Sequence, residues 1–114
     1  MSLTDFLQRL REKPDQIEFA ETIAVIERHY DYTPTAFRNA EIENAAGQNA
    51  GSCKIFAFAE LQGLDEAQTL ACFGRYYRDD VLKHPQGGDH PNIRHFMRTG
   101  WDGVAFDGPA LTAR

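Results

Sequence analysis

Residues 52–63 read SCKIFAFAELQG, and this stretch determines how the rest of the chain must fold. Ser52 is a suitable N-cap and Gly63 a suitable C-terminal residue, which predicts a helix from Cys53 to Gln62. Apolar side chains occupy nearly every side of this helix, and a helix of that kind must be buried on all faces. We therefore expect a central helix around which the remaining elements pack.

Two amphipathic helices are predicted before the central helix. Ser2 can cap a first helix that ends near Lys13, with leucine and phenylalanine side chains along one stripe. Pro14 can end this helix and open a second one, whose apolar face ends at Tyr30. The segment that follows is rich in asparagine, glycine and proline, which oppose regular helix, and residues 35–43 are expected to form a short β-hairpin or an irregular loop.

Two further helices are predicted after the central helix. Asp65 can cap a fourth helix, whose apolar face continues to Val81 and which should stop before Pro85. Asp89 is expected to cap a short fifth helix that is ended by Gly100. The fifth helix should turn three apolar side chains inward, those of Ile93, Phe96 and Met97.

These patterns predict a mainly α fold, with α+β as the alternative. We expect a compact bundle of about five short helices, with the small hairpin or loop described above. The apolar tail from Trp101 to Leu111 should pack back on the helices as a short strand or an irregular arm. A chain of 114 residues, of which 42% are hydrophobic, is sufficient for one core, so a single domain spanning residues 1–114 is expected.

Charge and composition argue against several classes of partner and location. The net charge of −5 repels nucleic acid and anionic membranes, and no apolar run approaches the roughly 20 residues that cross a bilayer. The N-terminus shows no Sec-type signal peptide, which favours the cytoplasm. Type III secretion signals have no apolar core that this test detects, so export by that route is compatible with the sequence.

One thiol is the sharpest candidate for a catalytic nucleophile. Cys53 lies in the first turn of the predicted central helix, where the helix dipole and Lys54 would lower a thiol pKa. The segment is similar to the nucleophile segment of papain-like proteases, but Gln48 lies too far from Cys53 and Lys54 replaces the expected aromatic residue. A chain of 114 residues is also too short for that two-domain fold. The favoured interpretation is a small buried residue of a core helix, so we expect neither Cys53 nor Cys72 to react quickly.

A second group of candidates is rich in histidine and aspartate. The group contains Asp79, Asp80, His84, Asp89, His90 and His95. Such side chains can hold a divalent metal or act as acid–base groups, and Asp89 and His90 are the catalytic candidates. Because no compact ligand motif is present, we favour ion pairs of Asp79 and Asp80 with nearby arginines (Arg75, Arg78 or Arg94). No bound metal and no cofactor are expected.

Side-chain amides and two arginines are the candidates for ligand binding. These residues are Asn39, Asn44, Gln48, Asn49, Arg78 and Arg94. Side-chain amides can bind a small polar ligand, but they also satisfy the backbone of a loop that lacks regular hydrogen bonds. Loop stabilisation is the favoured interpretation of the amides. The aromatic residues of the helices, Tyr76 and Tyr77 among them, are expected to lie in the core.

Two long strings resemble the HopJ family of type III effectors. The first is YTPTAFRN (residues 32–39) leading into GQNAGSCK (residues 47–54), and the second is FGRYYRDDVL (residues 73–82) leading into DHPNIR (residues 89–94). The resemblance extends from about Phe19 to Leu111. The family name refers to effectors of plant-pathogenic bacteria, although relatives occur widely in bacteria without that lifestyle. The resemblance implies no known reaction and no catalytic residues.

Two positions depart from the family pattern. Ala40 stands where the family would have glycine after Asn39, which puts a tight type I′ turn in doubt because that turn needs a positive φ at both central residues. Pro91 after His90 is the second departure.

The sequence favours an interaction or small-ligand-binding module, with an unknown protein or small molecule as partner. The alternative is a small enzyme, either a thiol hydrolase that uses Cys53 or a metal-dependent enzyme that uses the His/Asp group. We expect a monomer or a small homo-oligomer.

Overall fold

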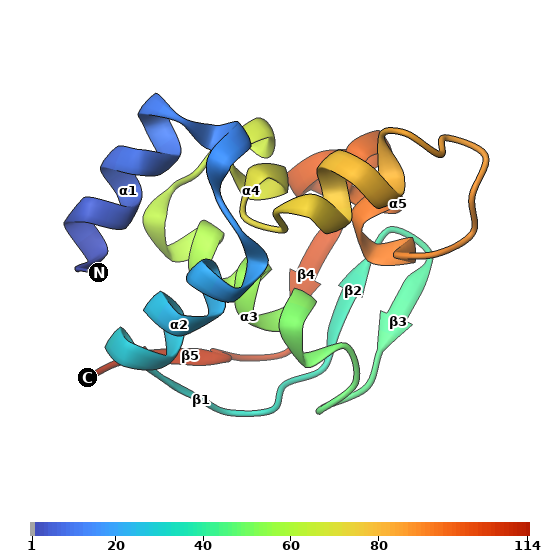
Figure 1. Ribbon diagram of the computed structural model, residues 1–114. Coiled ribbons are helices and arrows are strands. Elements are labelled where there is room, and N and C mark those ends of the chain that lie inside the picture. The colour runs from blue at the N-terminus through green and yellow to red at the C-terminus, as the bar shows by residue number, and fades with distance from the viewer. Residues whose placement is uncertain (1) are drawn as a thin grey trace.

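The central helix lies in the middle of the molecule, as its apolar composition predicts. The computed structural model describes residues 2–114, and Figure 1 shows α3 (Ala50–Gln62) in green between the other elements. The side chains of Ile55, Phe56 and Phe58 are each 0% exposed. The predicted cap was wrong, because the helix begins earlier and its N-cap is Asn49, not Ser52.

The two N-terminal helices pack on one side of α3. Helix α1 (Leu3–Glu12) is capped as predicted, since the Ser2 hydroxyl accepts the amide N–H of Asp5 at 3.1 Å. Pro14 opens only a single 3₁₀ turn, η1 (Pro14–Gln16), so the predicted start of the second helix was wrong. Helix α2 (Phe19–His29) begins after Glu18, whose backbone N–H donates to the Glu21 side chain at 3.1 Å.

Within residues 2–114, five short strands form two small antiparallel sheets. The strands are β1 (Tyr30–Tyr32), β2 (Phe37–Asn39), β3 (Ile42–Asn44), β4 (Val104–Phe106) and β5 (Leu111–Ala113). The predicted hairpin is confirmed as β2–β3, and the apolar tail adds β4 to the free edge of β2 and β5 to β1. Only Ala40 of the two central turn residues has a positive φ, of 56°, so the hairpin turn is not type I′.

The fourth predicted helix is interrupted. Helix α4 (Glu66–Ala71) is capped by Asp65 as predicted, but the continuous helix to Val81 was wrong. The chain turns at Gly74, which has a φ of 63°, and then forms a π-helix, η2 (Tyr76–Val81). The turn brings Gly74 so close to α2 that a β-carbon there would lie 2.5 Å from the backbone nitrogen of Phe19.

The fifth helix, α5 (Pro91–Thr99), ends at Gly100 as predicted. Its N-cap is His90, with a left-handed φ of 49°, and not Asp89 as we expected. Ile93 and Phe96 are buried, but Met97 is 43% exposed because it lies on the outer side of the helix, so its predicted inward position was wrong. A short 3₁₀ turn, η3 (Gly100–Gly103), leads into β4.

The result is an α+β architecture in which helix predominates, as the mainly α prediction broadly expected. In Figure 1, α1 and α2 lie on one side of α3, α5 and the β2–β3 hairpin lie on the other, and both termini are at the same end of the molecule. Phe56 links α3 to the segment after α4, to α5 and to β2, since its ring lies 5.5 Å from that of Phe73, 5.0 Å from that of Phe96 and 6.0 Å from that of Phe37. None of the helices within residues 2–114 is long and apolar enough to cross a membrane.

Candidate functional site

A pocket of about 310 Å³ opens where the first residues of α2, α3 and α5 meet η2. Its aromatic lining comes from Phe19, Phe73, Tyr76 and His90, and its polar lining residues include Asn49, Ser52 and Asn92. Tyr76 was expected in the core, but it is 39% exposed and faces this pocket. The pocket therefore combines an aromatic wall with a polar one.

The aromatic wall holds a histidine in a fixed orientation. The ring of Tyr76 lies 4.9 Å from that of Phe19 and 5.0 Å from that of His90. The Nε2 atom of His90 lies 2.9 Å from Oδ2 of Asp80, which is one helical turn after Tyr76 in η2. A carboxylate in this position fixes the tautomer and the rotation of an imidazole. His90 is thus suited to exchange a proton or to bind a cation.

Asp89 completes a cluster with this pair. Its Oδ2 atom lies 3.9 Å from His90 Nε2, while its Oδ1 atom accepts a hydrogen bond from Arg94. The hydrogen bond from Arg94 is the main cause that lowers the pKa of Asp89 below its usual range. Asp89 and His90 were predicted as candidates, and the structure brings both of them to Asp80.

Two helix N-termini form the polar wall. Asn49 and His90 are the N-caps of α3 and α5, both have a left-handed φ, and neither side chain makes a capping hydrogen bond. The first-turn amides of a helix have no partner within the helix and carry a partial positive charge. Ser52 and Asn92 belong to these first turns and line the pocket. This wall suits a ligand group that accepts hydrogen bonds.

The predicted asparagines form a cluster behind the pocket. Asn39 is 0% exposed and donates from Nδ2 to the backbone oxygen of Asn92 at 2.8 Å and to its side-chain oxygen at 3.1 Å. Asn44 accepts from the side chains of Asn92 at 3.0 Å and Asn49 at 2.6 Å. Gln48 accepts the amide of the nearby Ala45 and lies outside the pocket. Of the predicted amides, Asn49 alone reaches the pocket wall.

Neither thiol lines this pocket, and both are buried, as we expected. Cys53 is 0% exposed, and its sulfur lies 3.6 Å from the backbone oxygen of Thr35. Burial raises the thiol pKa and outweighs the lowering effect of the Thr35 contact and of the Lys54 charge. Burial likewise raises the pKa of Cys72 to about 12. Neither thiol is activated as a nucleophile in this state.

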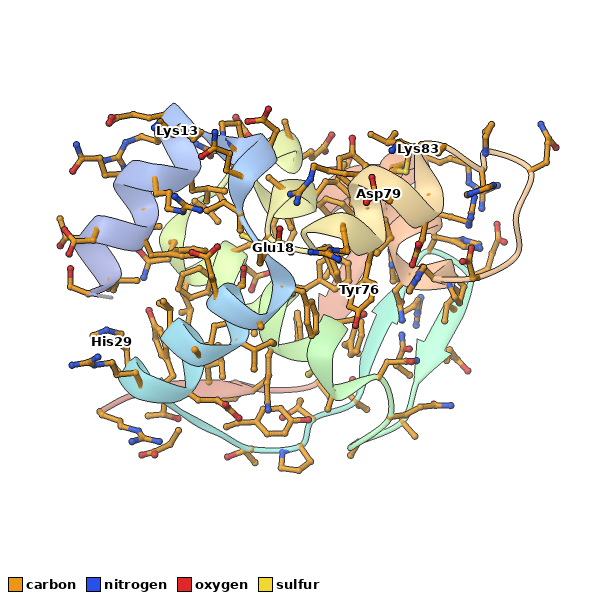
Figure 2. All side chains as sticks on the ribbon, in the orientation of Figure 1. Lys13, Glu18, His29, Tyr76, Asp79 and Lys83 are labelled. Carbon is orange, nitrogen blue, oxygen red and sulfur yellow. The ribbon has the colours of Figure 1, made fainter. Side chains whose placement is uncertain are left out.

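The predicted ion pairs of Asp79 and Asp80 with arginine were wrong. Asp79 pairs with Lys83 at 3.2 Å on the outer side of the η2 segment, away from Tyr76 (Figure 2), and Asp80 contacts His90. The arginines have other partners: Arg75 and Arg78 contact Glu18, and Arg94 contacts Asp89. His95 contacts Arg98, so the three predicted histidines do not converge. Phe19 and Ser52 carried no sequence signal for this pocket, because only the tertiary fold brings them to His90.

Comparisons with known proteins find relatives of nearly the whole chain. The family model described as HopJ type III effector protein matches residues 3–111. A crystal structure described as that of an unknown function protein, VPA0580, is 57% identical in sequence, with a TM-score of 0.99 over 100% of this chain and 95% of that chain. A comparison with curated proteins found none that is significantly similar.

Proposed function

This chain belongs to the HopJ type III effector protein family, and we propose that it is a small-ligand-binding module whose ligand occupies the pocket beside His90. The observation that carries the proposal is the pairing, in one pocket, of an aromatic wall that ends in the oriented His90 with two uncapped helix N-termini. Pockets that bind ligands combine apolar surface with a few well-placed polar groups in this way.

The lining indicates the chemistry of the ligand. A volume of about 310 Å³ is near the lower end of the range for small-molecule sites, which favours a small metabolite. The first-turn amides next to Ser52 and Asn92 would donate to a carboxylate or phosphate group. The ring of Tyr76 would pack against a flat or apolar part of the same molecule. We therefore propose a small organic anion as the ligand.

Amide chemical-shift mapping tests this proposal on the full chain. Titration with phenyl phosphate, benzoate and inorganic phosphate should give saturable shifts at Gly51, Ser52, Asn92 and Ile93. Ser52→Leu places an apolar side chain in the pocket and should weaken binding by at least about tenfold. Ala45→Leu is the matched control, because Ala45 is exposed and lines a different hollow beside the hairpin. Shifts that map elsewhere, or affinity that survives Ser52→Leu, would contradict the proposal.

A small enzyme is the second candidate function. The 2.9 Å contact between Asp80 and His90 resembles the arrangement by which a carboxylate orients a general base. Cys53 is not part of this alternative, since its thiol is buried with a raised pKa. A hydrolysis screen with activated esters and phosphates, in which His90→Gln removes all activity and Ser52→Leu weakens it, would favour the enzyme over a pure binding module.

The family description also supports export through a type III system as an alternative to the cytoplasm. A translocation reporter fused to the C-terminus of the full chain distinguishes the two locations. Reporter signal in a recipient cell that depends on the secretion system would favour export.

A further inference from the structure

We propose that Asp80, Asp89 and His90 bind one divalent transition-metal cation, as a site beyond the proposed ligand-binding function. One donor atom from each of the three residues lies within 4.8 Å of the other two, and Nε2 of His90 faces Oδ2 of both Asp80 and Asp89. One imidazole nitrogen and two carboxylate oxygens form a donor set that suits zinc or manganese. The expectation of no metal rested on the absence of a compact motif, and these donors come from two separate segments.

The spacing of the donors fits a cation. Metal–ligand bonds of about 2.0–2.2 Å place neighbouring ligand atoms about 3–3.5 Å apart. His90 Nε2 lies 2.9 Å from the Asp80 oxygen and 3.9 Å from the Asp89 oxygen. The longer distance closes by rotation of the Asp89 side chain, which is 55% exposed and therefore has space to move. The cation would take the place of the proton that His90 shares with Asp80.

Arg94 holds the two segments of the site together and leaves the donor atoms free. Its guanidinium contacts the backbone oxygens of His84 at 2.9 Å, Asp89 at 2.6 Å and Asp80 at 3.3 Å. It also contacts Oδ1 of Asp89, so Oδ2 of that carboxylate remains available. Outer contacts of this kind orient metal ligands. Two carboxylates against one guanidinium leave a net negative charge that favours a cation.

The imidazole is also held from its flat side. The ring of Tyr76 packs on that of His90 with an interplanar angle of 32°, and Nε2 is directed at Asp80. The His90 side chain is 28% exposed, so a cation has access from solvent and would retain water ligands. Three protein ligands with open positions are typical of exchangeable or catalytic metal sites rather than closed structural ones.

Calorimetric titration of the untagged, chelator-treated chain with zinc chloride tests the site. We expect one site, and a loss of affinity of about tenfold or more in Asp80→Asn and in His90→Gln. Asp79→Asn is the matched control. Asp79 is next to Asp80 in the chain and carries the same charge, but it pairs with Lys83 and not with His90. This control should bind zinc as the unsubstituted protein does. An equal loss in Asp79→Asn would overturn the proposal, since it would show only a general charge effect.

A second test uses only the unsubstituted chain, so its outcome does not depend on whether a variant folds. Manganese chloride added to the unsubstituted chain should first broaden the amide signals of residues 79–81 and of Asp89, His90 and Asn92. His29 provides an internal control, since it lies at the end of α2, on the opposite side of the molecule from Asp79 (Figure 2). Broadening that begins around His29 or His95, or no broadening at substoichiometric manganese, would overturn the proposal. Neither experiment uses the organic ligand, so failure here leaves the pocket proposal standing.

Discussion

Replacing Gly74 by alanine tests the contact that interrupts the fourth helix. Gly74 adopts a φ of 63°, and its Cα packs against the backbone at the start of α2. A β-carbon at this position would lie 2.5 Å from the nitrogen of Phe19 and 3.1 Å from the backbone of Glu18. Backbone atoms cannot rotate away as a side chain does, so the substitution must move α2 relative to η2.

Gly63 supplies a control with a similar positive φ and open space where its β-carbon would lie. It ends α3 with a φ of 67°, and apart from its chain neighbours no residue lies within 4 Å of the position that its β-carbon would take. A left-handed alanine costs about 1 kcal/mol, and this is the whole cost expected of Gly63→Ala. Overpacking adds about 2 kcal/mol at Gly74, so Gly74→Ala should cost about 3 kcal/mol.

Urea unfolding followed by far-UV circular dichroism gives both free energies of unfolding. The difference between the two variants isolates the steric contact, because the conformational cost is common to both. If Gly74→Ala costs no more than Gly63→Ala, the close approach of the chain at Gly74 is not what interrupts the helix. The reasoning would then be refuted even though both variants are destabilised.

Three further predictions concern buried polar groups. Iodoacetamide at neutral pH should label Cys53 slowly in the folded protein, because burial keeps its thiol protonated, and rapid stoichiometric labelling would contradict this. Because the pKa of Cys72 is raised to about 12, the folded thiol stays protonated while the unfolded one ionises near its ordinary value. Unfolding free energy should therefore fall as pH rises from about 9 toward 12, and Cys72→Ala should lack this part of the loss. Asn39→Leu removes two hydrogen bonds to Asn92 and should cost about 2 kcal/mol in urea unfolding, whereas Arg38→Leu, on the exposed face of the same strand, should cost little.

The parts of the fold that were predictable are those decided by local interactions. The caps at Ser2 and Asp65 and the helix end at Gly63 each depend on a few neighbouring residues, and the structure contains all three. The close approach at Gly74 involves Phe19, which is 55 positions away in the chain. The helical periodicity continues through that interruption, so the apolar pattern alone predicted one long helix.

The sequence identifies the residue types of the candidate site but not which of these residues contact one another. Asp89 and His90 stand out as groups that bind metals or transfer protons. Their partner could not be chosen from the sequence, because Asp79 and Asp80 are adjacent and only the phase of η2 decides which one faces His90. A π-helix turns about 20° less per residue than an α-helix, so α-helical spacing gives the wrong phase within it.

The interruption at Gly74 and the cluster around His90 are therefore parts of one arrangement. Redirection of the chain at Gly74 starts a new helical segment, and that segment places Tyr76 and Asp80 on the same side, where both contact His90. A continuous α4 would keep the axis set by residues 66–71, and we expect that it would not bring both side chains to the start of α5. Gly74→Ala should therefore weaken zinc binding in the fraction of protein that remains folded. Gly63→Ala should not, because Gly63 lies at the end of α3 that is far from the pocket. Equal zinc affinity in the two folded variants would show that the helix interruption does not position the zinc ligands.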